Sequence, residues 1–300
     1  MPRYHIDTDM GVDDGLALYN ANRVLGRSLT NVSTVWGNVT VETATRNALV
    51  FRALMPDARF DVVAGADRAL DGHRAGAGHV HGEDGLGGAA KTLGKRLLKR
   101  IAATEVKPLD ALPVGQGRVT IIGIGPATNI PYLVARYGKK NVTRIVLMSG
   151  AFFDPGNITP HAEFNAYSDP LALRRVLALG VPVTFVPLDL CRKIVLTRAT
   201  VRSYLKTNRS RVVRLLVESH MAYMDHYIAW EGLDGCFPHD AIAVLAAWRP
   251  ERFYRVPGRV TVETTGARRG KTTLVPDPRS SVEVAMGGDL KWVRQFLAAP

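Results

Sequence analysis

The sequence has 300 residues, 46% of them hydrophobic, and a formal net charge of +12 at pH 7. This composition is typical of a globular protein with a sizeable core. It contains no run of roughly 18 or more apolar residues that would predict a membrane helix, and no signal-peptide pattern. The two cysteines, Cys191 and Cys236, make no disulfide framework, which favours a reducing, cytoplasmic setting.

The positive charge is unevenly distributed along the chain. Residues 1–90 carry 8 Lys and Arg against 11 Asp and Glu, whereas basic residues gather at 91–107 and 192–214. Such runs are compatible with nucleic-acid contact. Because they lack interleaved aromatic residues and zinc-ligand spacing, solvated helical faces are the favoured interpretation and a nucleic-acid partner is not expected.

Four carboxylates follow the first predicted strand, in the stretch HIDTDMGVDDGLAL. Period two places Asp7 and Asp9 on the same face at the end of this strand. Asp13 and Asp14 fall in the first turn of a predicted helix. Clustered oxygen ligands without cysteine suit a hard cation, Ca²⁺ or Mg²⁺. Helix capping is the alternative, but it explains only one of the four carboxylates.

Strand-like runs alternate with helical patterns as far as residue 190, which predicts a mostly parallel sheet with right-handed crossovers. In chain order the elements are a strand at 29–38, a helix at 41–55, a strand at 61–66, a Gly- and His-rich loop at 79–88, a strand, turn and helix within 118–138, a strand at 144–153, a helix at 170–179 and a strand at 181–188.

The pattern changes after residue 190. Helices are predicted at 198–206, 208–229 and 239–247, short strands near 259–264 and 271–275, and a final helix from about 288. No Pro- or Gly-rich linker separates this part from the first. The fold class is therefore α/β: a mostly parallel open sheet flanked by helices, with a helical lid and a small C-terminal β appendage, in a single domain over residues 1–300.

Polar residues follow the predicted strands at five successive junctions. These are Asp9, Asn38, the 79–88 loop, Gly125 and the 154–169 loop. In open α/β sheets, ligands bind at the edge formed by the carboxyl ends of the strands. The sequence therefore predicts a ligand site at this edge.

Six motifs in the same order resemble those of the inosine-uridine preferring nucleoside hydrolases. They are DTDMGVDDGLAL, GNVTVETATRNA, HGEDGLGG, GIGPATN, MSGAFFDPGNITPHAEFNAYSDPLA and PHDAIAV, and the similarity spans residues 4 to 286. The resemblance implies an enzyme that hydrolyses the N-glycosidic bond of ribonucleosides to free base and ribose. It also implies a tightly held Ca²⁺ and a homodimer or homotetramer.

The resemblance implies a calcium site made by both ends of the chain. Its carboxylate ligands would be Asp9, Asp14 and Asp240, and the backbone carbonyl of Ile124 would be another ligand. Water and the ribose 2′- and 3′-hydroxyls would complete the six to eight oxygens that Ca²⁺ accepts, roughly. Asp9 would also be the general base to the metal-bound water.

The substrate-binding residues also come from the resemblance. Those around the sugar would be Asp13, Asn38 and Asn165 at the ribose hydroxyls, Asn157 and Glu163 at the 5′-hydroxyl, and Met148 at the pocket floor, where simple packing is the alternative. This polar lattice suits a transition state with oxocarbenium character.

Two histidines and one tyrosine are expected at the nucleobase. His239 matches the family's general-acid position, His81 would assist at the base, and Tyr227 would face it. Histidine titrates near neutral pH and so can donate a proton to a departing base. A core or capping histidine is the alternative for His239, and for His81 the functional and structural interpretations are equally open.

Two positions depart from the family pattern. Met10 replaces a usual proline, which predicts a less rigid turn. Ser149 replaces a usual glycine, which predicts a narrower pocket near the sugar.

Two other functions compete with the hydrolase. A haloacid-dehalogenase-type phosphatase would use Asp7 and Asp9 as its nucleophile pair, but the late GGDL segment at 287–290 lacks the second acid that this class needs. A basic nucleic-acid-binding protein would use the positive charge of residues 91–300. Both leave the other loop motifs unexplained and rank below the hydrolase.

Overall fold

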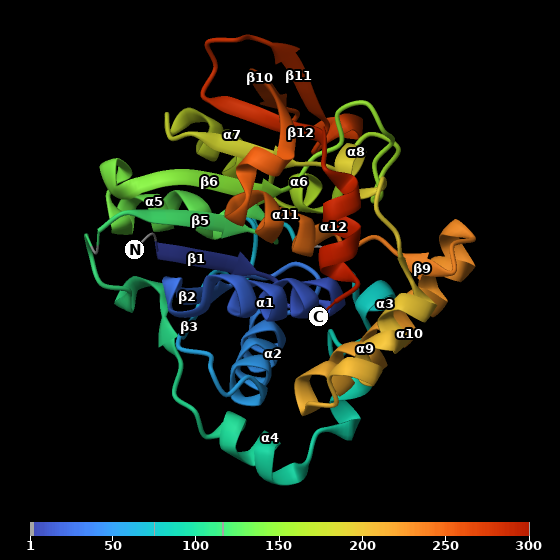
Figure 1. Ribbon diagram of the computed structural model, residues 1–300. Helices are drawn as coiled ribbons and strands as arrows, with labels where there is room; N and C mark the ends of the chain where they lie inside the picture. The colour runs from blue at the N-terminus through green and yellow to red at the C-terminus, as the bar shows by residue number, and fades with distance from the viewer. Residues whose placement is uncertain (1–2, 75, 116, 300) are drawn as a thin grey trace.

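A ten-stranded sheet runs through the computed structural model, which describes residues 3–74, 76–115 and 117–299 (Figure 1). Its strand order is β11-β10-β12-β7-β6-β5-β1-β2-β3-β4. Every neighbouring pair from β12 to β4 is parallel, and β10 and β11 are added antiparallel at one edge. The predicted mostly parallel sheet is confirmed.

The strands of this sheet are β1 (Arg3–Thr8), β2 (Leu29–Thr34), β3 (Asp61–Ala64), β4 (Lys107–Pro108), β5 (Val119–Gly123), β6 (Val142–Met148), β7 (Val183–Val186), β10 (Phe253–Val262), β11 (Thr272–Pro276) and β12 (Val282–Gly288). A separate antiparallel pair joins β8 (Leu196–Thr197) to β9 (Gly235–Cys236).

The α-helices are α1 (Val12–Leu25), α2 (Val41–Leu54), α3 (Gly78–His81), α4 (Lys95–Ala102), α5 (Ile130–Tyr137), α6 (Phe164–Ser168), α7 (Pro170–Ala178), α8 (Leu188–Cys191), α9 (Arg198–Thr207), α10 (Arg211–Glu231), α11 (His239–Trp248) and α12 (Leu290–Leu297). Most predicted helices match these within a few residues. The short helices α3, α6 and α8 lie in segments for which the sequence predicts no helix, and α4 lies in the basic run that is interpreted as a solvated helical face.

Both faces of the central strands are buried, because helices cover each side of the sheet. Ile122 and Val146 belong to the core that contains α1, α2, α10 and α11, whereas their neighbours Ile121 and Ile145 belong to the core that contains α5 and α7. This alternation follows from the period of two along a strand and gives the near-continuous hydrophobic runs of parallel strands.

Strand β12 is an element that the sequence did not predict. It pairs in parallel with β7 and antiparallel with β10, so the C-terminal strands continue the main sheet instead of forming a separate appendage. The VEVA alternation of this strand is short and runs into Gly287 and Gly288, which resembles a loop. Its partner β7 lies about a hundred residues earlier, beyond any local pattern.

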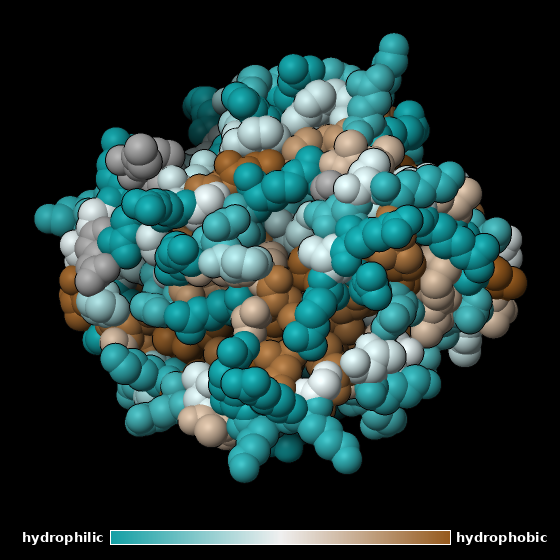
Figure 2. Space-filling model, turned by 60° about the horizontal axis from the view of Figure 1, so that its bottom comes forward, coloured by the Kyte–Doolittle hydropathy of each residue, from teal (hydrophilic) through white to brown (hydrophobic). Residues whose placement is uncertain are grey.

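The basic run at 91–107 contains α4, an amphipathic helix. Its Leu97 and Ile101 side chains are buried in the core, while Lys95, Lys99 and Arg100 are exposed. On the face turned forward in Figure 2, hydrophilic residues cover most of the surface and hydrophobic ones show in the hollows between them. No helix in the described ranges has the length and apolarity needed to span a lipid bilayer.

Candidate active site

The carboxyl ends of the central strands open into a cavity of about 300 Å³. It is lined by most of the predicted site residues: Asp13, Asn38, His81, Ile124, Met148, Asn157, Glu163, Asn165, Tyr227, His239 and Asp240. Asp9 and Asp14 are fully buried beside this lining. The strand-end edge therefore gathers the residues that the sequence predicted.

The turn after β1 is held in an uncommon conformation. Met10 has a φ of 37°, in the left-handed region that non-glycine residues rarely adopt. Its N–H donates a hydrogen bond to Thr8 Oγ1 at 3.1 Å. A proline would lack this donor and could not adopt this φ, so methionine at this position makes a turn that is fixed by hydrogen bonding instead of by a ring.

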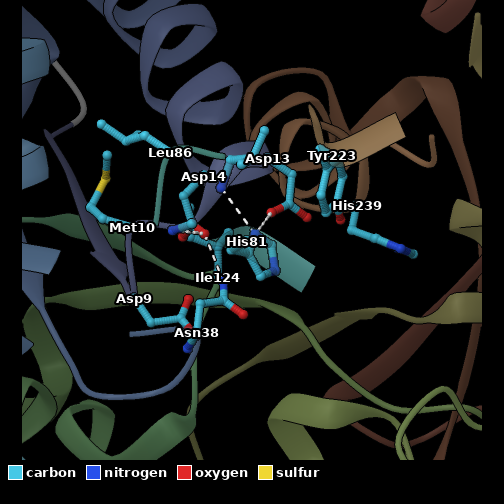
Figure 3. Close-up of polar contacts among 12 residues, drawn as sticks. Asp9, Met10, Asp13, Asp14, Asn38, His81, Leu86, Ile124, Tyr223 and His239 are labelled. Atoms are coloured by element: carbon cyan, nitrogen blue, oxygen red, sulfur yellow. Dashed lines mark hydrogen bonds and ion pairs between the residues drawn. The ribbon is translucent and has the colours of Figure 1, made fainter. Parts of the chain in front are cut away.

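Gly11 allows two loops to close on the start of α1. A Cβ atom there would lie 2.6 Å from both His81 Nδ1 and Asn38 Nδ2. Figure 3 shows these two side chains approaching the start of α1. The absence of a side chain at Gly11 is therefore required for this close approach.

Asp14 caps α1 and also belongs to the acidic cluster. Its carboxylate accepts hydrogen bonds from Thr8 Oγ1 at 2.5 Å, from the Gly11 N–H at 2.7 Å and from Asn38 Nδ2 at 3.1 Å. The reach back to the Gly11 N–H is that of a capping box. Capping thus accounts for Asp14 and leaves Asp9 and Asp13 to be explained.

Four buried carboxylates meet at the floor of the site. Among the described residues, oxygens of Asp13, Asp14 and Asp240 lie within 4.8 Å of one another. The expected ligand Asp9 lies outside this group; its Oδ2 accepts from the Asn38 N–H at 2.7 Å. Within the part of the chain that the structure describes, Asp9 Oδ1 and Asp13 Oδ1 have no hydrogen-bond partner.

Burial and mutual repulsion change the ionisation of these groups. Burial raises the pKa of Asp9, Asp13, Asp14 and Asp240, and the neighbouring carboxylates raise it further for Asp9, Asp13 and Asp240. The pKa of Asp13 reaches about 8. Unpartnered, buried carboxylate oxygens need a proton or a cation. With oxygen donors alone, the cluster fits a hard cation such as Ca²⁺ or Mg²⁺.

The side chain of Asn165 is oriented by two backbone carbonyls. Its Nδ2 donates to Met148 O at 3.0 Å and to Ile124 O at 3.3 Å. Both amide hydrogens are then used inside the protein, and the Oδ1 atom is left to accept a hydrogen bond. A hydroxyl-bearing ligand in the cavity would meet an acceptor here.

Glu163 is the N-cap of α6, and its carboxylate is well supplied with donors. Oε1 accepts from the Asn165 N–H at 2.8 Å, and Oε2 accepts from the N–H groups of Gly150 and Ala166 at 2.9 and 3.0 Å. The Ser149 hydroxyl donates to Oε2 at 3.4 Å. Ser149 is not among the described residues that line the cavity, so its side chain supports Glu163 at this site and does not occupy the pocket.

Next to the acidic cluster, a chain of aromatic and histidine side chains lies along α10, and it begins at His81, whose Nδ1 is 3.9 Å from Asp13 Oδ1. His81 stacks on Tyr223 with ring centroids 5.1 Å apart and an interplanar angle of 28°. The hydroxyls of Tyr223 and Tyr227 are 3.4 Å apart, and the Tyr227 hydroxyl is 3.3 Å from His239 Nε2. Tyr223 therefore extends the predicted pair of Tyr227 and His239.

Both histidines of this chain are neutral at physiological pH. Burial lowers the pKa of His81 and of His239 to about 3. His81 Nδ1 accepts the Val12 N–H at 3.1 Å, so its proton is on Nε2, which is free to donate. His239 Nδ1 has no hydrogen-bond partner within the described ranges.

The comparison with known proteins agrees with this geometry. The family model of the inosine-uridine preferring nucleoside hydrolases matches residues 4–295. The chain belongs to this nucleoside hydrolase family. It is therefore an enzyme that hydrolyses the N-glycosidic bond of ribonucleosides, and the family is metal-dependent.

Individual relatives of this nucleoside hydrolase match nearly the whole length of its chain. It is 33% identical to the non-specific ribonucleoside hydrolase RihC of Escherichia coli (strain SMS-3-5 / SECEC), covering 98% of this chain and 96% of that protein. It is 32% identical to the probable uridine nucleosidase 2 of Oryza sativa subsp. japonica, covering 90% and 80%. Among solved structures, the plant nucleoside hydrolase PpNRh1 superposes with a TM-score of 0.84 at 27% identity, covering 99% and 98%.

Two aspartates that the sequence analysis did not single out fix the loops of this nucleoside hydrolase. Asp84 accepts from the N–H groups of Leu86, Gly88 and Ala90 at 2.8 to 2.9 Å and so closes the loop after His81. Asp189 accepts from three successive N–H groups, at residues 152–154, and so anchors the loop that carries Asn157. The glycine-rich run GEDGLGG is a sequence signal that points to Asp84. No comparable sequence signal points to Asp189.

Asp7 has a structural role in this nucleoside hydrolase. Its Oδ1 accepts hydrogen bonds from Ser33 Oγ and from Asn129 Nδ2, and burial raises its pKa to about 7. It is fully buried and is not among the described residues that line the cavity. The phosphatase alternative, which needs Asp7 and Asp9 together at the substrate, does not fit this arrangement.

Proposed function

We propose that this enzyme hydrolyses purine and pyrimidine ribonucleosides with the help of Ca²⁺, with the sugar at the aspartate cluster and the base against α10. One observation carries the proposal: a buried acidic cluster, whose Asp13 and Asp240 line the cavity, and a chain of neutral histidine and tyrosine side chains border the same cavity of about 300 Å³. The first set suits a cation and a sugar diol, and the second suits a departing base.

The cation would be held by Asp14 and Asp240, with further oxygens from Asp9, Asp13 and the carbonyl of Ile124. Bound there, Ca²⁺ would neutralise the clustered charge and polarise the attacking water and the ribose diol. The resemblance supports Asp9, Asp14, Asp240 and the Ile124 carbonyl as ligands. The group of oxygens within 4.8 Å supports Asp14 and Asp240 and adds Asp13.

Asp9 would be the general base. Its Oδ2 is held by the Asn38 N–H, which leaves the unpartnered Oδ1 to take a proton from the attacking water. A raised pKa makes this carboxylate a stronger base than an exposed one. As the sugar flattens and gains positive charge, the acceptors Asn165 Oδ1 and Asp13 would bind its hydroxyls more strongly, which lowers the barrier.

The nucleobase would leave with a proton delivered through His239. Because His239 is neutral, it acts best by passing a proton on, with the Tyr227 hydroxyl at its Nε2 and Tyr223 behind it. The negative charge that develops on the departing base favours a protonated neighbour at that moment. His81 would add a hydrogen bond from Nε2. Asn157, whose Oδ1 accepts the Phe164 N–H, would enclose the 5′ end together with Glu163, and Met148 would form the floor.

We also propose that residues 1–300 form one domain, that the protein assembles as a homodimer or homotetramer, and that it is cytoplasmic. The family resemblance supports the first two proposals. The free, buried Cys191 and Cys236 support the third. Sedimentation velocity gives the mass of the assembly.

The test is release of reducing sugar from inosine, adenosine, uridine and cytidine, before and after treatment with a chelator. We expect release to stop on chelation and to return with Ca²⁺. In Asp9→Asn, kcat should fall by about 10²–10⁴-fold with the fold intact. The exposed Asp57→Asn variant is the matched control and should behave as wild type. Full activity after chelation, or in Asp9→Asn, would contradict the proposal.

A further inference from the structure

Three aromatic residues of α10 share one helical face. Tyr223, Tyr227 and Trp230 are spaced at i, i+4 and i+7, which places them in line along the helix. Tyr223 and Tyr227 are buried, whereas Trp230 is 74% exposed, and all three line the cavity. This face of α10 therefore runs from the hydrogen-bonded chain at the base end out to the rim.

The exposed indole is held in place by two histidines. Trp230 stacks on His226 with ring centroids 5.6 Å apart and an interplanar angle of 24°. His79, from α3, lies 5.9 Å from the His226 ring and 6.5 Å from the indole. His226 covers one face of the indole. Most of the side chain is nevertheless exposed, and it belongs to the residues that line the cavity.

An exposed tryptophan that stacks on a neighbouring ring at a cavity rim points to a ligand. A large apolar side chain contributes to folding only when it is buried, so its exposure here has no packing benefit. Stacking on His226 limits its rotamers in advance, which lowers the entropy lost when a ligand binds. Of the four tryptophans, Trp36 is buried and Trp248 and Trp292 are partly buried in the core, so Trp230 stands apart.

We propose that Trp230, backed by His226 and His79, forms an outer stacking subsite for the distal ring of a bicyclic nucleobase. The inference rests on the proposed function, because it takes the ribose to lie at the aspartate cluster. From there a purine extends one ring further toward the rim than a pyrimidine does. A purine ribonucleoside therefore reaches the exposed indole, and a pyrimidine ribonucleoside stops at Tyr227.

The predicted effect is on binding and is selective for the base. Stacking of a nucleobase on an aromatic side chain is worth about five- to 160-fold in affinity. We expect Trp230→Ala to raise KM for inosine by about tenfold and KM for uridine by less than about twofold, with kcat changed little, because the contact is remote from the reacting bond. Trp230→Phe keeps a stacking face and should remain close to wild type.

Two further variants test the arrangement of the rings. His226→Ala removes the ring behind the indole and should raise KM for inosine by about threefold. Tyr254→Ala is the control, because it removes an aromatic residue that is 66% exposed on β10 and is not among the cavity-lining residues described. It should change the KM for neither inosine nor uridine.

A binding measurement separates this inference from the proposed function. In an Asp9→Asn background, inosine should quench the emission of Trp230 and uridine should quench it less. The quenching should be absent in Asp9→Asn, Trp230→Ala. If inosine quenched the emission of Trp230 while the wild-type protein released no ribose, the subsite would be supported and the proposed function would have failed.

Two results would overturn the subsite. In the first, Trp230→Ala leaves the KM for inosine unchanged, or raises it by no more than it raises the KM for uridine. The second is a smaller assembly in sedimentation, with activity lost on both substrates, which would assign Trp230 to a contact between copies of the chain.

Discussion

The position of Asp9 depends on a glycine in the loop after β2, and adding one methyl group there tests its role. In Gly37→Ala the new Cβ would lie 2.1 Å from Asp9 Oδ2 and 2.8 Å from Pro126 Cδ. Non-bonded heavy atoms in contact lie roughly 3.5 Å apart, so the carboxylate must move by more than about 1 Å. The same move stretches the 2.7 Å hydrogen bond from the Asn38 N–H.

The expected loss follows from this displacement. A catalytic group misplaced by about 1 Å costs on the order of 10²-fold in rate. We expect kcat/KM of Gly37→Ala to fall about 100-fold for inosine and uridine alike, since Asp9 acts on the water and not on the base. Ribose release at saturating Ca²⁺ measures the rate, and circular dichroism with thermal unfolding confirms that the fold is kept.

The matched control is Gly287→Ala on β12. A Cβ atom there would meet nothing within 4 Å, so this variant should keep wild-type activity. If folded Gly37→Ala hydrolysed both nucleosides within about threefold of the wild-type rate, the reasoning that a fixed Asp9 carboxylate drives the reaction would be refuted.

Two more predictions concern histidines. His239→Ala should lower kcat for inosine by about 10²–10³-fold and leave a nitrophenyl riboside nearly unaffected, because nitrophenolate departs without a proton; equal losses would remove the acid role. Burial lowers the pKa of His220 to about 4, against 6.5 unfolded, so its contribution to stability is complete above pH 6.5 and is lost as the pH falls toward 4. Between pH 7.5 and 5.5, the free energy of unfolding measured in urea should therefore fall by about 1.4 kcal/mol less in His220→Leu than in the wild type. Equal falls in the two proteins would contradict this prediction.

Much of the fold was predictable because its signals are local. Strands and helices alternate in the sequence, and the carboxyl ends of parallel strands meet at one edge, so Asn38, Ile124 and Met148 come together as expected. Strand β12 was missed because its pairing with β7 is non-local. The backbone of Met10 was not predictable either, since its positive φ depends on packing and on the Thr8 hydroxyl.

The finer chemistry of the site depends on side-chain geometry that spacing does not determine. The resemblance implies Asp9 as a metal ligand and Asp13 at the ribose hydroxyls, whereas the side-chain geometry brings Asp13, and not Asp9, into the group of oxygens within 4.8 Å. Tyr223 had a usable signal, four residues before Tyr227 on a predicted helix. Its stacking on His81 and its place in the hydrogen-bond chain require coordinates.

Asp14 and Asp240 come from opposite ends of the polypeptide, at the starts of α1 and α11, two helices that pack against each other. During translation the ribosome must release most of the chain before these two carboxylates can meet. A nascent chain, or a fragment that ends before α11, therefore lacks the Asp240 carboxylate of the acidic cluster and is expected to leave cellular nucleosides intact.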